Sequence, residues 1–270
     1  MSVLLHISDP HFGTEQAHVM AALLDLSHQQ RPDLLVLCGD ITQRACADQF
    51  RRARAFVDQL HVPLLAIPGN HDIPLFNLGA RVLQPYARFS AAFGQDLAPE
   101  HESPDMLVLG VNTTRWYRHK NGEVSSEQIE RVARRLASAS PRQLRVVVVH
   151  HPVAVTRTEE AHNLLRGRHN ALHHWADAGA DLVLGGHIHL PYVLALAGLG
   201  QPMWAVQAGT AVSSRVRDGA PNSVNVLRWR GGVPDGLCLI ERWNYSDTAD
   251  AFVCQSVTDV RPDRDVNAKP

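Results

Sequence analysis

The chain has 270 residues, 45% of them hydrophobic, so it can close a sizeable core as one large domain or two small ones. Lys and Arg total 26 against 27 for Asp and Glu, which excludes a general electrostatic attraction to nucleic acid or an anionic membrane. The four cysteines lack C-x-x-C pairing, the first residues show no signal peptide, and no apolar run approaches the roughly 18 residues of a membrane span. We therefore expect a cytoplasmic globular protein with reduced thiols.

Apolar runs typical of buried strands recur along the first two thirds of the chain, and each ends at a polar residue. Helical periodicity fills several of the intervals, and Ser125 with Gln128 forms a capping-box pattern at the start of one helix. The predicted strands are 3–8, 33–40, 63–70, 106–112, 144–151 and 181–187, and the predicted helices are 15–30, 47–59, 125–138 and 169–178. This alternation predicts an α/β fold.

After residue 190 the pattern changes to short segments punctuated by Gly and Pro, without helical periodicity. We interpret these segments, YVLALAG, PMWAVQAG, SVNVLRWR and GLCLIERWNY, as an antiparallel addition that belongs to a second sheet. No repeat or linker divides the chain. We therefore expect a single domain over residues 1–257, followed by a loose polar tail over residues 258–270.

Side chains able to bind metals follow most of the predicted strands, and the carboxyl ends of strands in an open α/β sheet gather at one edge. Carboxylate, imidazole and amide donors without thiolate suit Mn, Fe or Zn better than soft ions. One such residue alone would more often be a turn residue, an N-cap or a packed histidine, but their joint occurrence favours a metal site. The residues are Asp9, His11, Asp40, Asn70, His71, Asp72, His150, His151, His187 and His189.

In five motifs the sequence resembles the calcineurin-like metallophosphoesterase superfamily. The motifs are D-P-H at 9–11, G-D at 39–40, G-N-H-D at 69–72, H-H-P at 150–152 and G-H-I-H at 186–189, and the resemblance covers residues 1–212. Within the superfamily, the sequence is most similar to the bacterial class III cyclic nucleotide phosphodiesterases. The resemblance implies a four-layer α-β-β-α sandwich of two mixed sheets, with the site at the carboxyl ends of the strands.

The resemblance also implies a binuclear centre of two Mn, Fe or Zn ions, in which a metal-bound hydroxide attacks phosphorus. The implied ligands of the first ion are Asp9, His11, Asp40 and His189, and those of the second are Asp40, Asn70, His150 and His187. Asp40 is thus a shared ligand and a catalytic residue. His71 is the implied catalytic proton donor or phosphate ligand, and Asn70 is also a substrate-binding candidate.

One motif departs from the superfamily pattern. Related protein serine/threonine phosphatases carry G-D-Y-V-D-R-G, whereas this chain has G-D-I-T-Q-R-A, so Gln43 stands where an Asp orients the imidazole. The dyad with His71 is then absent or rebuilt, with Asp72 as one choice. Arg44 matches an arginine of the superfamily and is either a phosphate contact or a solvated charge at a helix start.

Two long loops, 111–125 and 207–217, combine cations with aromatic or hydroxyl side chains. Such loops either hold a phosphate and stack a ring or remain solvated. Arg115 and Arg215 are their substrate-binding candidates.

We expect a binuclear metal-dependent phosphodiesterase that hydrolyses small phosphodiesters, with 3',5'-cyclic nucleotides as leading substrates by resemblance alone. The alternatives are a phosphomonoesterase or a phospholipid or nucleotide-sugar hydrolase. A nuclease and a non-catalytic scaffold are less favoured, because the chain is charge-balanced and every expected ligand is present. The expected partner is a small phosphoester, without nucleic acid or a membrane span, and a homo-oligomer stays open.

Overall fold

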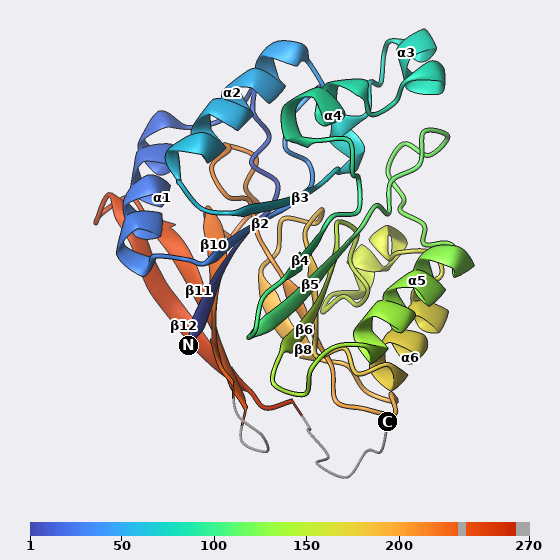
Figure 1. Ribbon diagram of the computed structural model, residues 1–270. Coiled ribbons are helices and arrows are strands. Elements are labelled where there is room, and N and C mark those ends of the chain that lie inside the picture. The colour runs from blue at the N-terminus through green and yellow to red at the C-terminus, as the bar shows by residue number, and fades with distance from the viewer. Residues whose placement is uncertain (232–235, 263–270) are drawn as a thin grey trace.

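The structure, a computed structural model, describes residues 1–231 and 236–262 and contains two sheets that pack face to face (Figure 1). The strands are β1 Ser2–Ile7, β2 Leu34–Cys38, β3 Leu64–Ile67, β4 Glu100–Glu102, β5 Met106–Val111, β6 Leu144–Val149, β7 Leu182–Gly185, β8 Tyr192–Ala195, β9 Trp204–Gln207, β10 Ser223–Arg230, β11 Leu237–Ser246 and β12 Ala251–Val260. The helices are α1 Ala17–Gln30, α2 Ala47–Gln59, α3 Leu78–Leu83, α4 Ala87–Phe93, α5 Ser126–Ala137 and α6 Arg168–Asp177, with the 3₁₀ turns η1 Asn70–Asp72 and η2 Thr158–Asn163.

Both sheets are mixed. The first has the strand order β12-β11-β10-β1-β2-β3, with β1, β2 and β3 parallel. The second has the order β4-β5-β6-β7-β9-β8, with β5, β6, β7 and β9 parallel. The carboxyl ends of the parallel strands in both sheets therefore supply the loops that build the site.

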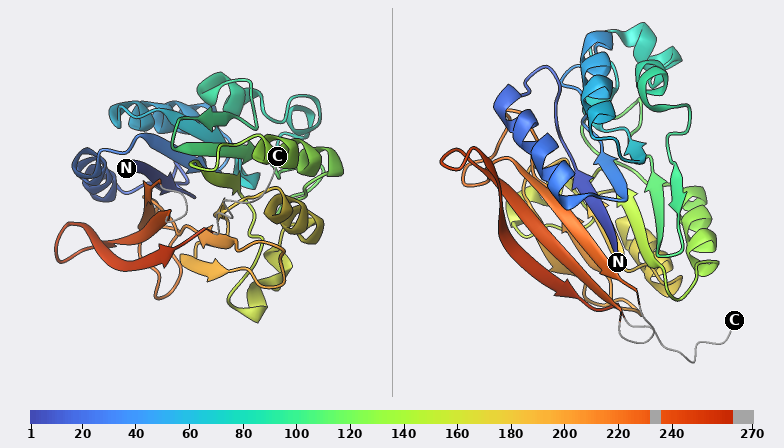
Figure 2. Two further views of the ribbon diagram at one scale, coloured as in Figure 1. Left: turned by 60° about the horizontal axis from the view of Figure 1, so that its bottom comes forward. Right: turned by 60° about the vertical axis from the view of Figure 1, so that its left-hand side comes forward.

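The views in Figure 2 show the layers of helices and sheets. Three apolar clusters lie between these four layers. One lies between the first sheet and helices α1, α2 and α4, one lies between the second sheet and helices α5 and α6, and one lies between the sheets. Alternate strand residues serve alternate clusters, so that Leu35 and Leu37 face the helices while Leu34 and Val36 face the other sheet. Strands buried on both faces explain why the sequence shows continuous apolar runs. The predicted four-layer α-β-β-α architecture is confirmed.

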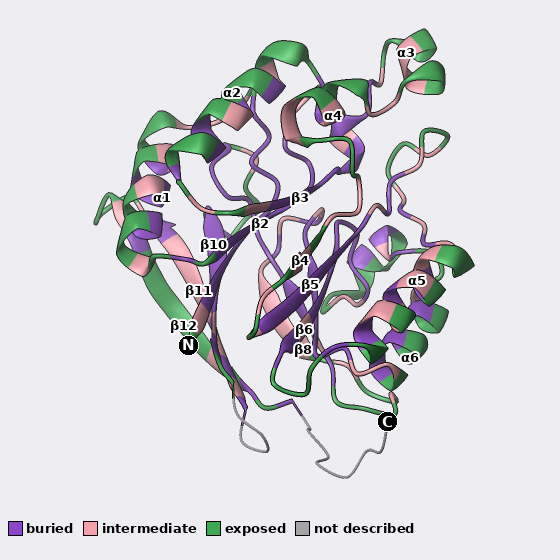
Figure 3. Ribbon diagram, in the orientation of Figure 1, coloured by how far each residue is buried: buried purple, intermediate pink, exposed green. Residues whose placement is uncertain are grey.

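The four predicted helices are present as α1, α2, α5 and α6, each within two residues of its expected ends. Ser125 accepts a hydrogen bond from the backbone N–H of Gln128, whose side chain returns to the Ser125 N–H, so the predicted capping box forms. The short elements α3, α4, β4, η1 and η2 were not predicted. None of them carries a long periodic pattern, and α3 contains no buried residue (Figure 3).

The interpretation of the segments after residue 190 is wrong in part. β8 and β9 join the second sheet, but β9 runs parallel to β7. β10, β11 and β12 instead extend the first sheet, because β10 pairs antiparallel with β1, which would otherwise be an edge strand. The pairing register of an apolar run does not reveal which open edge it will fill.

The prediction that the chain is loose from residue 258 onwards is wrong for residues 258–260. The last residues of β12 pair with β11, and Val260 is buried opposite Cys238. Residues 263–270 lie outside the described residues. Among the described residues, no helix is long and apolar enough to cross a membrane.

Candidate metal centre

The predicted ligands sit on sharp turns at the strand ends, and most of them have left-handed backbone conformations. Asp9 (φ 53°), His11 (φ 42°), Asp40 (φ 47°), His187 (φ 74°) and His189 (φ 60°) all have positive φ. Non-glycine residues rarely adopt this conformation, and it costs about 1–3 kcal/mol where the surrounding structure imposes it. Such strain is concentrated at functional sites.

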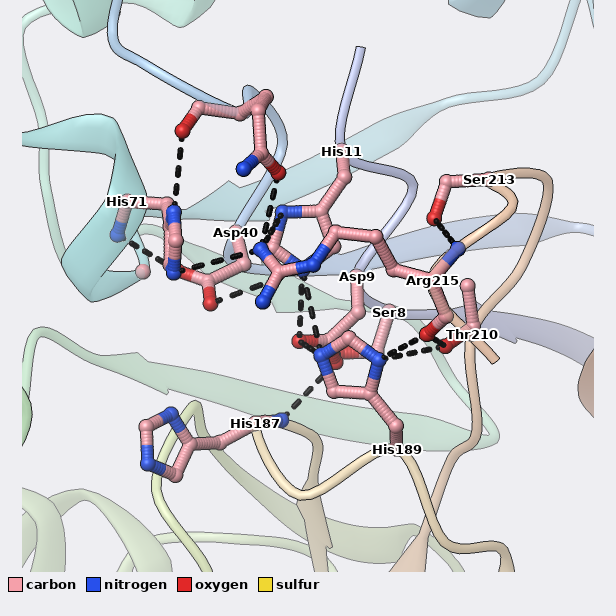
Figure 4. Close-up of polar contacts among 12 residues, drawn as sticks. Ser8, Asp9, His11, Asp40, His71, His187, His189, Thr210, Ser213 and Arg215 are labelled. Atoms are coloured by element: carbon pink, nitrogen blue, oxygen red, sulfur yellow. Dashed lines mark hydrogen bonds and ion pairs between the residues drawn. The ribbon is translucent and has the colours of Figure 1, made fainter. Parts of the chain in front are cut away.

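One group of donor atoms gathers where β1 ends and the loop after β7 turns. His11 Nε2 lies 3.2 Å from His189 Nε2 and 3.7 Å from Asp9 Oδ1, and His189 Nε2 lies 3.4 Å from the same Asp9 oxygen. All three residues offer an atom within 4.8 Å of the others. Figure 4 shows the two rings facing each other beside the carboxylate.

A second group is formed by Asp40, His150 and His187, whose donor atoms also lie within 4.8 Å of one another. His150 Nε2 lies 3.3 Å from Asp40 Oδ1. Asn70 lies in the turn that follows β3 and lines the same cavity as Asp40 and His187.

Asp40 connects the two groups through its two oxygens. Oδ1 faces His150, whereas Oδ2 lies 3.9 Å from His11 Nε2. The backbone N–H of His71 donates to Oδ1 at 2.8 Å and fixes the orientation of the carboxylate. This geometry is suited to a carboxylate that two ions share.

Four buried polar atoms of these residues have no hydrogen-bond partner: Asp9 Oδ1, Asn70 Oδ1, His150 Nε2 and His187 Nδ1. A buried acceptor without a partner costs about 1–3 kcal/mol, so four such atoms in one place call for a ligand. Oxygen and nitrogen donors without thiolate fit ions such as Mn, Fe or Zn.

Neighbouring groups hold the donors in place. His150 Nδ1 donates to the Cys38 carbonyl at 2.8 Å, and His189 Nδ1 lies 2.6 Å from the Arg215 carbonyl, which leaves Nε2 of both rings for an ion. Asp9 uses its Oδ2 to accept from the His187 backbone N–H and from the Ser8 hydroxyl. Contacts of this kind fix the tautomer and the orientation of metal ligands.

Two glycines allow the close approach of these loops. A Cβ on Gly69 would lie 2.0 Å from the Asp40 backbone nitrogen, and a Cβ on Gly186 would lie 1.8 Å from Ser8 Oγ. Any side chain at either position would displace a carboxylate of the site.

Burial and charge oppose each other at the ionisable groups. Burial disfavours ionisation of Asp40, but the imidazoles of His150, His71 and His11 outweigh it and hold the Asp40 pKa well below its usual range. Burial lowers the His150 pKa, but Asp40 and Asp9 overcome it and raise this pKa to about 9. Desolvation on burial keeps the pKa of His11 and His187 well below the usual histidine value, and it raises the Asp9 pKa. The surrounding imidazoles therefore keep the Asp40 carboxylate ionised, whereas burial disfavours the charge on Asp9.

His71 lies on the open side of the site, beside Arg215. Its Nδ1 contacts the backbone carbonyl of Gln43 at 3.0 Å, and its Nε2 lies 3.5 Å from Arg215 Nη1. The Arg215 guanidinium also donates to the Gln43 side-chain oxygen at 2.9 Å and lies 3.5 Å from His11 Nδ1. Figure 4 shows it beside the rings of His71 and His11.

The suggested dyad of His71 with Asp72 does not form. The Asp72 carboxylate accepts from the backbone N–H groups of Ile41, Thr42 and Gly69 and supports the turn. A backbone carbonyl, that of Gln43, holds the imidazole instead.

A cavity of about 440 Å³ opens over the metal centre and brings several predicted residues together. Arg44 lies outside it, in a small side cavity with His71, and its guanidinium is 5.4 Å from the Phe76 ring centroid. Arg115 is not among the described residues that line the cavity. Its guanidinium instead donates to the Asn112 and Thr114 carbonyls. The cavity is lined by Asp40, Asn70, His71, Lys120, Glu160, His162, Asn163, His187, Ile188, His189, Arg215, Val216 and Arg217.

Sequence reasoning missed the cavity wall formed by η2. Glu160 is buried, contacts Arg217 Nη2 at 2.8 Å and accepts from Asn163 Nδ2 at 2.7 Å. Residues 158–163 have no motif or periodicity, so the sequence carries no signal for this wall.

Comparisons with known proteins identify the family of the chain. Residues 2–191 match the family model for calcineurin-like phosphoesterases. A glycerophosphodiester phosphodiesterase of Enterobacter lignolyticus is 35% identical over 82 residues, which cover 26% of this chain and 29% of that protein. A probable cyclic nucleotide phosphodiesterase of Synechococcus is 28% identical over 181 residues, which cover 64% of each protein. These alignments thus span less than two thirds of either relative.

A solved structure has the same fold. The purple acid phosphatase PPD1 of yellow lupin matches 96% of this chain and 53% of its own chain, with a TM-score of 0.68 and 11% sequence identity.

Proposed function

The chain belongs to the calcineurin-like phosphoesterase family, and on that premise we propose that it is a binuclear metal-dependent phosphodiesterase acting on small substrates. The observation that carries this proposal is the position of Asp40, whose two oxygens face two separate groups of donor atoms. The first ion would be held by Asp9, His11, Asp40 and His189, and the second by Asp40, Asn70, His150 and His187. Two such ions, when bound, would lower the pKa of a coordinated water and would neutralise charge on the phosphoryl oxygens.

Arg215 is the cation best placed to bind the phosphate. It extends from the loop after β9 to the rings of His11 and His71, and the Gln43 side chain holds it there. A planar guanidinium can donate two parallel hydrogen bonds to phosphate oxygens. Lys120 also lines the cavity and can add a second positive charge.

His71 is the candidate proton donor. Since its Nδ1 is held by the Gln43 carbonyl, its Nε2 is the atom that faces the cavity. Donation to the leaving alkoxide requires hydrogen on both ring nitrogens. That step also requires Arg215 to move from Nε2 to the phosphate.

The cavity favours a diester over a monoester. Its 440 Å³ provides room for two substituents, and Glu160 pairs with Arg217, so that this guanidinium is already neutralised. A phosphodiester brings one negative charge, whereas a monoester brings up to two and calls for more free cations. The names of the two curated relatives make cyclic nucleotides and glycerophosphodiesters the first substrates to test.

Turnover of bis-(p-nitrophenyl) phosphate and p-nitrophenyl phosphate by the Mn²⁺-loaded protein tests the proposal. We expect a higher kcat/KM for the diester at the same pH. A marked preference for the monoester would instead establish a phosphomonoesterase. Arg215→Ala should lose roughly tenfold or more in kcat/KM, whereas the exposed Arg134→Ala on α5 should behave as the unaltered chain. A panel of 3',5'-cyclic nucleotides, glycerophosphodiesters and phospholipids would then identify the substrate class.

A further inference from the structure

Exposed apolar side chains are concentrated beside the candidate metal centre. Seven of the ten exposed large hydrophobic residues in the described chain lie in three short segments, and in an ordinary monomer such residues are scattered singly. They are Phe76, Leu78, Val82, Leu83, Trp116, Tyr117 and Val216. Val216 lines the main cavity, and Leu75, next to Phe76, lines the side cavity with His71. This clustering indicates an interaction surface.

Two of the segments form one continuous surface, which we call the rim surface and define as residues 76–83 and 116–120 together with Arg44. Arg81 of α3 donates to the Arg118 carbonyl at 2.6 Å, and the Tyr86 hydroxyl lies 2.8 Å from Thr114 Oγ1. Arg44 lies over the Phe76 ring. Figure 1 shows α3 and the loop after β5 projecting from the same side of the molecule.

The rim surface has no packing role in the chain. No residue of α3 is buried, and Leu78 and Leu83 are 70% and 80% exposed. Trp116 and Tyr117 contact each other edge to face and are 45% and 54% exposed. Burial of a large apolar side chain stabilises the folded state by roughly 1.5–3 kcal/mol, and these exposed side chains lack that contribution.

The charge of the rim surface has one sign. Residues 73–95 and 106–122 contain no Asp or Glu, although the whole chain is balanced at a net charge of −1. Desolvation and the neighbouring Arg81 charge lower the pKa of His119 and disfavour its charged form, so the cations on this surface are Arg44, Arg81, Arg118 and Lys120. Of these, only Arg118 forms an ion pair with a described residue, Glu123, which lies outside the rim surface. Elsewhere arginines pair regularly with acids, as Arg54 does with Asp58.

The apolar tips and the cations of the rim surface favour an anionic lipid surface over a second copy of the chain as its binding partner. A second copy of the chain would place this basic surface against itself across a two-fold axis, and the like charges would repel. An anionic lipid surface offers the complementary charge, and it accepts apolar tips, with Trp and Tyr at the boundary between water and hydrocarbon. We propose that the rim surface docks the protein reversibly on anionic lipid bilayers and turns the mouth of the cavity towards the lipid headgroups. This docking does not depend on the proposed catalytic function.

Co-sedimentation with phosphatidylcholine vesicles, with and without phosphatidylglycerol, tests the proposal. We expect the full chain to pellet only with the phosphatidylglycerol vesicles and to be released by salt. Leu78→Ser/Leu83→Ser should weaken this binding by roughly tenfold or more, because both apolar tips are lost. Val253→Ser/Val257→Ser on the exposed strand β12 is the matched control and should bind as the unaltered chain does. Far-ultraviolet circular dichroism of both double variants would confirm that they fold.

Trp116 provides a second readout. Of the five tryptophans, only Trp116 is exposed, so its emission should shift to the blue on vesicle binding, and Trp116→Phe should abolish the shift. Equal pelleting with neutral vesicles, no pelleting at all, or unchanged binding by Leu78→Ser/Leu83→Ser would overturn the proposal. So would a dimer, detected by light scattering, that this double variant dissociates, since a second copy would then cover the rim surface.

Discussion

At the scale of single residues, the candidate metal centre is built from groups that are individually unfavourable. Asp9 and Asp40 are buried carboxylates, and five ligand residues have left-handed backbone conformations. Each unpartnered donor or acceptor costs about 1–3 kcal/mol, and the backbone strain adds a similar amount per residue. The rest of the fold must offset this cost in the metal-free chain, and bound ions would remove part of it.

The candidate ligand residues could be proposed from sequence, because their residue types follow strands at fixed spacings. The groups that orient them were not. The Gln43 carbonyl at His71 and the Arg215 carbonyl at His189 are backbone atoms, which any residue type could supply. Arg215 was a candidate from the cations of its loop, and its position beside His11 and His71 depends on a tertiary contact with Gln43.

The variant His71→Ala should show that His71 serves proton delivery to the leaving group and not metal binding. We expect the variant to keep both ions, since the metal-facing donors do not include this ring. Hydrolysis of esters with alkyl leaving groups should fall by about 10²–10⁴-fold, and hydrolysis of nitrophenyl esters should fall far less, because nitrophenolate scarcely needs protonation. Equal losses on both substrates would remove the role of His71 as an acid. Arg134→Ala on the exposed face of α5 is the control, because this side chain contacts neither the ring nor the cavity residues.

At the scale of elements, strands and helices with a long apolar pattern were predicted well, and short elements without one were not. α2 matches its expected range because periodicity defines both ends. α3 has no buried face, so no apolar pattern could reveal it. The partners of β10 were not predictable, because its apolar run fits either sheet equally well.

We expect the free energy of unfolding to depend on pH through His6 of β1, which lies opposite Asn225 of β10. His6 Nδ1 is 3.3 Å from Asn225 Nδ2, its Nε2 has no hydrogen-bond partner, and burial lowers its pKa from 6.5 to about 3. Between these two pKa values the unfolded chain binds a proton that the folded chain excludes. The folded state therefore loses stability as the pH falls below 6.5, by about 2 kcal/mol from this group at about pH 5.

Denaturant unfolding of the metal-free chain at about pH 7 and about pH 5 would measure this effect. His6→Leu should reduce the loss of unfolding free energy between the two pH values by about 2 kcal/mol. His28→Gln, at an exposed position in α1, is the matched control and should leave the loss as it is. An identical loss in His6→Leu and the unaltered chain would show that His6 is not the group that titrates.

At the scale of the whole molecule, the candidate metal centre joins the two sheets. Asp9, Asp40 and Asn70 follow strands of the first sheet, whereas His150, His187 and His189 follow strands of the second. The four-layer sandwich was predictable, and so was the location of the candidate site at the carboxyl ends of the strands, because five motifs in chain order specify both. The rim surface was not, since the net charge and composition average over the surface and hide a local excess of cations. A cytoplasmic location and a homo-oligomeric state remain predictions.

Because the ligands come from both sheets, bound ions should stabilise the entire fold. A ligand present at a thousandfold its Kd adds about 4 kcal/mol to the folded state, which corresponds to roughly 10 °C in Tm for a chain of this size. We expect Mn²⁺ to raise the Tm of the EDTA-treated chain by roughly this amount. Asp40→Ala should lose most of the increase, since both groups of donors share this carboxylate, whereas Asp58→Ala on the exposed face of α2 should keep it. Comparing each variant with and without Mn²⁺ cancels any change in metal-free stability. If Mn²⁺ raised the Tm of Asp40→Ala by as much as it raises that of the unaltered chain, Asp40 would not be the shared ligand. Ion binding at the two sites would then not be coupled through this carboxylate.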